Sequence, residues 1–347
     1  AEILSVALAI PVQVAMASAG FGVWALVTGT LLMPVIQTVC TFKFSAWRPG
    51  IRMGSARGRE ILNFGSAKLG GSISWAVYEQ ADMLVLGKIS GEVGVGLYSM
   101  AKQIALLPVH KISVVVNQIA FPLMAGLQDN VEQMGSVFLR QIRMVACLTC
   151  PLCIGLALVT EDLVWVALTE KWVPLVPVLQ VLCVSSVVRS CEVLFPPILL
   201  ARYRASVLFW WTIGLLLVMP IAFWAGAAAS GGLGVALVWA LVYPVMIAGM
   251  VQRALKEINL SWKAVWNEVA PILKGTLVMA ISVGLLHSAM QAGDAATHML
   301  RLVLSVGLGG LVYGGCIFWQ GGRLVPEIVQ LVRWVIGKDM AFNPKST

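Results

Sequence analysis

Charged residues are scarce in this chain. They make up 12% of its 347 residues, against 59% apolar residues, and the mean hydropathy is +0.88. Soluble domains carry about 25% charged residues. The shortage of charge therefore excludes an ordinary soluble protein and indicates a chain that lies in a lipid bilayer.

Several signatures of enzymes and metal proteins are also missing. The sequence contains no Walker A loop, no dinucleotide-binding fingerprint and no nucleophile elbow, and its three histidines are scattered. Cys147, Cys150 and Cys153 have the spacing of an iron–sulfur motif, but no fourth cysteine before a proline follows. We therefore predict no catalytic site, metal or cofactor, and we expect these thiols to pack as small apolar groups.

Long apolar runs, by contrast, are abundant. Several reach the ~20 residues that a helix needs to cross a hydrocarbon core of ~30 Å, and they do not alternate as the strands of a membrane barrel do. The pattern predicts an all-α, polytopic membrane bundle with about ten transmembrane helices. The predicted spans are 3–20, 22–42, 63–88, 95–125, 143–160, 174–200, 206–228, 232–252, 270–290 and 302–319.

The first residues, AEILSVALAI, lack a methionine and also the basic stretch and cleavage site of a signal peptide. They lie at the edge of the first predicted span. We therefore expect an N-terminally truncated fragment whose upstream helices are missing.

The net charge of +8 is unevenly distributed along the chain. Alternating spans place five segments on one side of the membrane, and these hold seventeen of the 24 lysines and arginines; the opposite loops hold three, and four lie inside spans. Such a bias marks the cytoplasmic side, so it is an orientation signal rather than a nucleic-acid site, and it predicts a cytoplasmic C-terminus. The five segments are 43–60, 126–143, 201–205, 252–274 and 319–347.

Some charged residues fall where lipid is expected. Glu79 and Asp82 lie one helical turn apart in the third span, and Lys68 falls within about 60° of both on a regular helix. A charge at the bilayer centre costs about 2.5–3.5 kcal/mol on insertion scales. We therefore expect the two carboxylates to face a polar cavity, whereas Lys68 could instead extend to the membrane surface.

Two more spans add polar groups. The fourth contains Lys102 and Asn117, and the sixth contains Arg189 and Glu192 at i and i+3. At this spacing Arg189 and Glu192 could simply pair with each other on one helix, as an alternative to lining a cavity. Together these residues predict a mixed-charge cavity inside a helical bundle, which indicates transport. The candidate binding residues are Lys68, Lys102, Arg189 and Asn117; the candidates for charge balance or ion coupling are Glu79, Asp82 and Glu192.

The stretch EQADMLVLGKISGEVGVGLYSMAKQIALLPVHKI (79–112) resembles the seventh and eighth helices of polysaccharide flippases, in the multidrug/oligosaccharidyl-lipid/polysaccharide exporter superfamily. The resemblance extends over essentially the whole chain, and the order and spacing of its motifs carry more weight than any single one. The further motifs are GFGVWALVTG (20–29), WRPG (47–50), FPLMAGLQDN (121–130) and EKWVP (170–174).

The resemblance implies a fold and a domain organisation. Longer members of the family have fourteen helices, in two six-helix lobes around a central cavity plus two extra helices, so the ten spans would be helices five to fourteen. The implied parts are 1–42, the end of the N-terminal lobe; 43–62, a basic cytoplasmic inter-lobe loop; 63–256, the C-terminal lobe; 257–322, two additional helices; and 323–347, a cytoplasmic tail.

It also implies a function. Family members are not enzymes; they flip undecaprenyl-pyrophosphate-linked oligosaccharides across the cytoplasmic (inner) membrane by alternating access, for exopolysaccharide, O-antigen or capsule synthesis. The implied partners are this substrate, the bilayer, and a polysaccharide polymerase with its export machinery. Asp82 and Lys102 match the acidic and basic positions of the seventh and eighth helices. The alternatives are a cation-coupled multidrug exporter and a membrane glycosyltransferase or polymerase.

Overall fold

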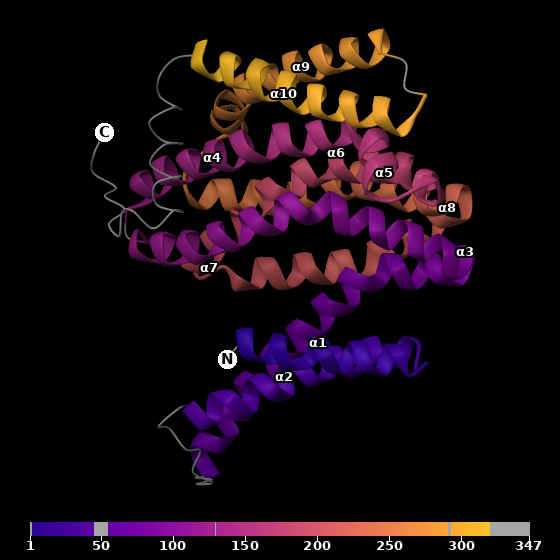
Figure 1. Ribbon diagram of the computed structural model, residues 1–347. Coiled ribbons are helices and arrows are strands. Elements are labelled where there is room, and N and C mark those ends of the chain that lie inside the picture. The colour runs from indigo at the N-terminus through magenta and orange to yellow at the C-terminus, as the bar shows by residue number, and fades with distance from the viewer. Residues whose placement is uncertain (1, 45–54, 129, 291–292, 320–347) are drawn as a thin grey trace. The chain divides into compact units, whose positions relative to one another are not determined.

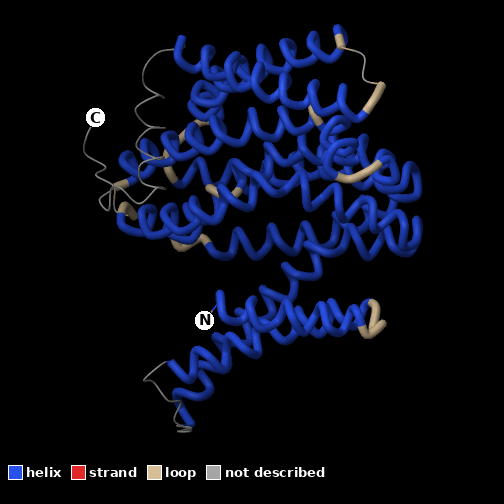
Figure 2. Tube along the Cα trace, in the orientation of Figure 1, coloured by secondary structure: helices blue, strands red, loops and turns tan. Residues whose placement is uncertain are grey.

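The described residues of the chain form an all-helical structure. In the computed structural model every regular element of the described part is a helix, with no strand (Figure 2), which confirms the predicted all-α class. The described residues are 2–44, 55–128, 130–290 and 293–319. Within them, side chains are described everywhere except at 2–4, 44, 55–73, 113–122 and 125.

Contacts divide the chain into two compact units, Ala1–Ala67 and Lys68–Thr347. In the first unit, α1 (Glu2–Ser18) and α2 (Val23–Phe44) form a hairpin whose turn contains two glycines with positive φ, a conformation that costs glycine little. The division lies close to residue 63, where the C-terminal lobe is predicted to begin. That the units correspond to transporter lobes stays a prediction.

Two very long helices each reverse direction at a glycine. The helix α3 (Ser55–Gly126) is interrupted at Gly91, whose φ of 67° and ψ of −171° belong to a region essentially reserved for glycine. The helix α8 (Ala205–Glu257) is interrupted at Ser230 and Gly231. A straight helix of its 53 residues would be about 80 Å long, far more than a bilayer core. Each therefore supplies two of the predicted spans.

The remaining elements of the second unit also follow the predicted order. Its long helices run roughly parallel to one another (Figure 1), with a short helix and a 3₁₀ turn at one end. These elements are α4 (Val131–Leu158), α5 (Thr160–Ala167), η1 (Glu170–Leu175), α6 (Val176–Glu192), α7 (Phe195–Ala201), α9 (Trp262–Ala289) and α10 (Ala295–Trp319).

Six helical stretches in the described residues are long and apolar enough to cross a membrane. Because α8 is a hairpin, the six correspond to seven predicted spans; the other three are α1 and the two halves of α3, which are shorter or more polar. The prediction of a multi-pass membrane protein is confirmed. The six stretches are Val23–Lys43, Val131–Leu158, Glu170–Ala201, Ala205–Glu257, Trp262–Ala289 and Ala295–Trp319.

Some helices begin earlier than their predicted spans. The fifth span was expected from 143, but α4 begins at Val131, where the Asn130 side chain accepts a hydrogen bond from the Gln133 amide at 3.0 Å. In the same way Ser261 caps α9 ahead of residue 270. Hydropathy cannot distinguish a polar helix end from a loop, whereas N-cap residues can. The loops before α4 and α9 are therefore shorter than the predicted segments 126–143 and 252–274.

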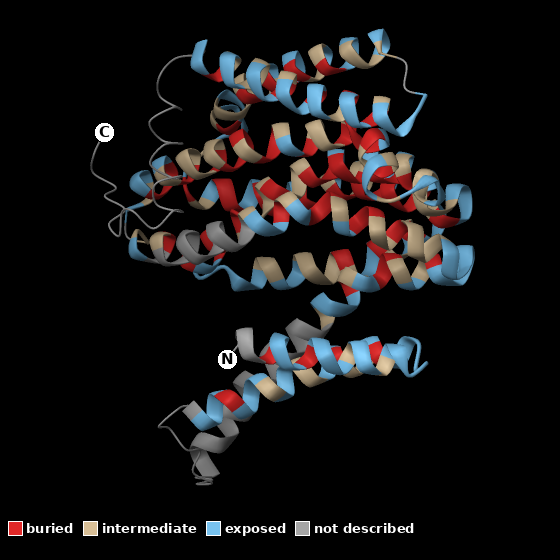
Figure 3. Cartoon of the chain, viewed as in Figure 1, coloured by how far each residue is buried: buried red, intermediate tan, exposed pale blue. Residues whose placement is uncertain are grey.

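Large aromatic side chains fill the interior of the second unit. Tyr78, Tyr98 and Trp239 are almost completely buried and belong to one apolar cluster between α3, α6 and α8. The exterior is apolar as well, since Ile221 and Leu311 are more than two-thirds exposed. Figure 3 shows the exposed positions along the outer helices. An exposed apolar exterior of this kind fits a surface covered by lipid.

The turns of the second unit gather at two opposite ends. At one end, Arg202 Nη1 donates to the Gln128 carbonyl at 2.9 Å and Arg204 pairs with Glu257 at 2.7 Å, so the turns after α3, α7 and α8 meet there. At the other end, Gly231 lies beside Ser90. Arg202 and Arg204 lie at the first end, the end that the predicted topology places in the cytoplasm.

Candidate functional site

A buried carboxylate, Asp82, lies at the centre of the polar site in the second unit. It is 0% exposed. Its Oδ2 accepts hydrogen bonds from Lys102 Nζ (2.7 Å), the Tyr98 hydroxyl (2.7 Å) and Trp239 Nε1 (3.0 Å), and its Oδ1 accepts from the Met83 amide (2.8 Å). Four donors, one of them cationic, replace the water that burial removes.

Lys102 reaches Asp82 from the other half of the α3 hairpin. Its Nζ also donates to the Glu79 carbonyl at 3.0 Å, so a single ammonium group ties together the two arms of the hairpin. The structure thus brings together two of the predicted site residues, Asp82 and Lys102, as a buried ion pair. Loss of either partner from such a pair leaves an uncompensated charge in a medium of low dielectric constant.

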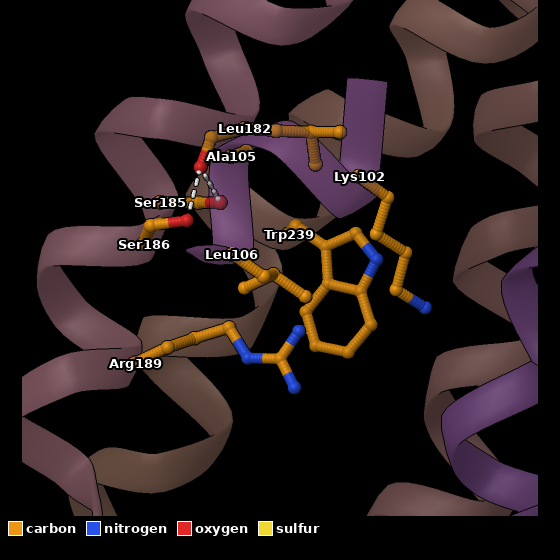
Figure 4. A pocket seen from close by; sticks show the side chains of 8 residues that line it. All are labelled: Lys102, Ala105, Leu106, Leu182, Ser185, Ser186, Arg189 and Trp239. Carbon is orange, nitrogen blue, oxygen red and sulfur yellow. Dashed lines mark hydrogen bonds between the residues drawn. The ribbon is translucent and has the colours of Figure 1, made fainter. Parts of the chain in front are cut away.

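The indole of Trp239 lies between two cationic side chains (Figure 4). Its ring centroid is 5.6 Å from Lys102 Nζ and 4.5 Å from the Arg189 guanidinium carbon. Cations within about 6 Å of an indole face are attracted by the quadrupole of the ring. Trp239 therefore connects α3 to α6 by contacts that involve both cations, while its N–H is directed at Asp82 and the Tyr98 hydroxyl.

Arg189 and Glu192 each contact aromatic residues of α8. Glu192 accepts a short hydrogen bond from the Tyr243 hydroxyl, and the Arg189 guanidinium lies 6.0 Å from the Tyr243 ring centroid. Among the described side chains, Arg189 makes no hydrogen bond or ion pair with a carboxylate. The close intrahelical pair considered for these two residues is not formed in this structure.

A small cavity of about 10 Å³ lies between Lys102 and Arg189. That is roughly the space of one water molecule, and two serines line it, Ser185 and Ser186, whose hydroxyls both donate to the Leu182 carbonyl at 2.8 Å (Figure 4). This cavity is too small to hold an oligosaccharide. The polar site is thus a compact charge network rather than an open chamber.

The other predicted site residues are less fully defined. Glu79 is half-buried, and its carboxylate has no hydrogen-bond or ion-pair partner among the described residues, although its backbone carbonyl binds Lys102. Lys68 and Asn117 lie in α3, but their side chains lie outside the described set. Their roles, like those of all the candidate residues, stay predictions.

The sequence reasoning missed the aromatic partners of this site. Tyr98, Trp239 and Tyr243 carry no charge, so a charge pattern does not reveal them. A signal was present: a buried Tyr or Trp in an apolar span needs a partner for its O–H or N–H. Tyr98 lies four residues before Lys102, and Tyr243 four residues after Trp239, which places each pair on one helix face.

A second polar cluster, also missed, joins α5 to α9 and α10. The completely buried Asp162 accepts from Arg301 Nε (2.8 Å) and His298 Nδ1 (2.7 Å), and Arg301 Nη2 lies 2.6 Å from the same oxygen. His287 Nε2 is 3.5 Å from Asp162 Oδ2. The predicted span 302–319 leaves Arg301 in the preceding loop. Its burial shows that this end of the unit is held together by charge.

The comparisons with known proteins agree with the resemblance seen in the sequence. A family model described as "Polysaccharide biosynthesis protein" matches residues 1–177, which is just over half of the chain. The chain belongs to the polysaccharide biosynthesis protein family. The family predicted from the sequence is thereby confirmed.

The chain is similar to three bacterial proteins that are named for the biosynthesis of polysaccharides or for the transport that belongs to it. It is 30% identical to the teichuronic acid biosynthesis protein TuaB of Bacillus subtilis (strain 168) over 277 residues, covering 77% of the chain and 55% of the relative. It is 28% identical to the lipopolysaccharide biosynthesis protein WzxC of Escherichia coli (strain K12) over 218 residues, covering 62% and 44%. It is 23% identical to the succinoglycan biosynthesis transport protein ExoT of Rhizobium meliloti (strain 1021) over 342 residues, covering 96% and 67%. The chain spans about half the length of the first two.

Proposed function

We propose that the protein is a transporter, not an enzyme, which flips lipid-linked oligosaccharide units across the cytoplasmic membrane for cell-surface polysaccharide synthesis. The observation that carries the proposal is the charge network of Asp82, Lys102 and Arg189 inside an apolar, multi-pass member of the polysaccharide biosynthesis family. Charges inside a membrane bundle are costly and mark transport paths. A relative whose name includes "transport protein" supports the same reading.

The substrate class proposed is an oligosaccharide on undecaprenyl pyrophosphate. Its pyrophosphate needs a cation, and Arg189 is better suited than Lys102, because Lys102 is already neutralised by Asp82 at 2.7 Å. A guanidinium also matches phosphate oxygens in two-point contact. A polysaccharide polymerase with its export machinery would receive the product.

The proposed location is the cytoplasmic membrane, with the basic end and the C-terminus in the cytoplasm. The basic residues near the turns of the second unit support this orientation. A multidrug exporter is disfavoured because the relatives are named for polysaccharides.

Deletion of the gene in its natural host tests the proposal. We expect surface polysaccharide to fall and complete lipid-linked units to accumulate on the cytoplasmic face, accessible to a glycosidase in inverted vesicles but not in intact cells. The intact protein should restore export, and Arg189→Gln should not, at equal abundance in the membrane. Lys263→Gln, an exposed residue at the start of α9, is the matched control. Accumulation of incomplete glycans instead of complete units would indicate a glycosyltransferase.

A further inference from the structure

The guanidinium of Arg189 is held by aromatic rings and not by carboxylates. Its central carbon lies 4.5 Å from the Trp239 ring centroid (Figure 4) and 6.0 Å from the Tyr243 ring centroid. Among the residues that the structure describes, Arg189 donates no hydrogen bond and forms no ion pair. The N–H groups of its guanidinium are therefore available to a ligand.

The carboxylate that could neutralise Arg189 on its own helix is occupied elsewhere. Glu192 follows Arg189 by three residues in α6, but its carboxylate accepts a hydrogen bond from the Tyr243 hydroxyl. Glu192 therefore acts on the guanidinium through space, without a direct contact. Tyr243 thus serves two neighbours, because its ring lies beside the cation while its hydroxyl holds the carboxylate.

The ring of Trp239 is fixed from several sides. It is almost completely buried, and its N–H lies 3.0 Å from Asp82 Oδ2 and 3.1 Å from the Tyr98 hydroxyl. The rings of Phe223 and Tyr243 pack against it with centroids 5.2 and 5.0 Å away. A side chain locked by packing and hydrogen bonds keeps one orientation. A cation held on this ring is therefore held in one place as well.

A stacked ring and a bound anion use different parts of a guanidinium. The ring attracts the cation through the negative face of its π-system. The N–H groups lie in the plane of the guanidinium and match phosphate oxygens in two-point contact. Trp239 can therefore stabilise the charge of Arg189 without competing with an anion. A carboxylate partner would compete, because it binds the same N–H groups.

We propose that Trp239 is a positioning residue, whose ring orients the guanidinium of Arg189 for the pyrophosphate of a lipid-linked substrate. The inference rests on the proposed function for the identity of the anion. The contact between ring and cation needs no substrate. Two experiments therefore separate the positioning role from the proposed function.

The first experiment measures the contact without a ligand. Tryptophan with increasing numbers of fluorine atoms, incorporated only at position 239, weakens the negative face of the ring but keeps its shape and its N–H. We expect the thermal unfolding temperature of the intact protein in lipid nanodiscs to fall stepwise along this series.

Arg189→Gln should reduce this dependence by at least about half, the remainder coming from Lys102 on the same ring. Fluorine also changes the hydrogen bond from the indole N–H to Asp82, but it does so equally with and without Arg189. The same series at Trp210, an exposed tryptophan of α8, is the matched control and should have no effect. An equal dependence in wild-type and Arg189→Gln protein would show that the ring does not hold this cation.

The second experiment measures binding of undecaprenyl pyrophosphate, with undecaprenol as the probe that lacks the anion. Along the fluorinated series at position 239 we expect the Kd for undecaprenyl pyrophosphate to rise by about tenfold, while the Kd for undecaprenol stays constant. Trp239→Phe, which keeps a ring, should bind the pyrophosphate more tightly than Trp239→Leu at equal amounts of folded protein.

The possible failures of the second experiment have different meanings. If wild-type protein binds the pyrophosphate but the Kd is unchanged or falls with fluorination, Trp239 does not position Arg189 for the anion. If wild-type protein binds undecaprenyl pyrophosphate no more tightly than undecaprenol, the proposed function is refuted together with the identity of the anion. The first experiment would then still report whether the ring holds the guanidinium.

Discussion

At the scale of single residues, one carboxylate organises the site. Asp82 is buried with Lys102, Tyr98 and Trp239 around it, and each of these three side chains makes a second contact. Such a network is stable only when all its hydrogen bonds are made, because a buried polar group that loses its partner is costly in a medium of low dielectric constant. Asp82 and Lys102 are therefore expected to behave as a unit.

The pair can be tested by a double-mutant cycle. Lys102→Met and Asp82→Asn should each lower the free energy of unfolding by about 3–5 kcal/mol, since each leaves a buried charge uncompensated. The double variant should recover most of this loss. Folded protein in the membrane and thermal unfolding in detergent provide the measurement.

The control for this cycle is Lys256→Met, an exposed lysine in the last turn of α8. It should change stability by less than about 0.5 kcal/mol. If the losses of the two single variants simply add in the double variant, then Asp82 and Lys102 do not form a coupled pair.

At the scale of elements, the reversals within α3 and α8 determine which helix faces contact each other. In α8 the arms touch at Gly226 and Gly234, where an added Cβ at Gly234 would lie 1.8 Å from the Gly226 carbonyl oxygen. An added Cβ at Gly226 would also lie 3.0 Å from Val238 Cγ2, in the residue before Trp239. The fold of α3 likewise brings Lys102 back to Asp82, which is 20 residues earlier in the chain. The site is therefore a product of two tight reversals.

A buried cluster of charged side chains attaches α9 and α10 to the rest of the second unit. Asp162 in α5 is surrounded by Arg301, His298 and His287, and Trp165 stacks on His298 with ring centroids 5.3 Å apart. These contacts lie at the end opposite the basic turns. Because Arg301 is itself buried, the cluster depends on the charge of Asp162.

Asp162→Asn should therefore loosen the α9–α10 hairpin. The change removes the charge at nearly constant volume and leaves Arg301 with only the longer ion-pair contact to Glu161, at 3.4 Å. Amide hydrogen exchange across residues 285–305 should therefore accelerate by at least about tenfold. Exchange in 176–192, which forms α6, should stay close to the wild-type rate. Mass spectrometry of peptides from the intact protein would measure both.

Asp294→Asn is the matched control, because Asp294 is an exposed aspartate in the turn before α10. It should leave both rates unchanged. An equal acceleration over the whole chain in Asp162→Asn would indicate general destabilisation, and no acceleration would show that the cluster does not hold the hairpin.

At the scale of the whole molecule, the polar groups of the second unit differ between its two ends. Arg202, Arg204 and Lys263 lie at the end where the turns after α3, α7 and α8 meet. The opposite end contains the Asp162 cluster. Basic residues concentrate on the cytoplasmic side of membrane proteins because they are retained there during insertion.

The orientation predicts the result of a labelling experiment. Single cysteines are introduced at Lys263 and at Asp294 after replacement of the seven natural cysteines. An impermeant thiol reagent applied to intact cells should label position 294, and it should reach position 263 only after the cells are opened. Labelling with the reverse pattern would invert the topology.

The sequence by itself determined the class of this protein. Scarce charge and long apolar runs are properties of single segments, so they predicted an all-α, multi-pass bundle, and the motifs from residue 79 onward indicated its family. Hydropathy also located the reversals near residues 91 and 230. It misplaced the starts of α4 and α9, because a polar helix end and a loop have the same hydropathy.

Only the tertiary structure decided which polar groups pair. The sequence offered Lys102 as a candidate substrate ligand, and Arg189 as a second candidate ligand or as the intrahelical partner of Glu192. The folded chain instead pairs Lys102 with Asp82 and directs Tyr98 and Trp239 at the same carboxylate. Pairing depends on the rotation and depth of helices that are distant in the chain, and packing fixes both. The charge pattern of the sequence identified the candidate residues but not their partners. The arrangement of α3, α6 and α8 leaves Glu79 and Arg189 without ion-pair partners among the residues described.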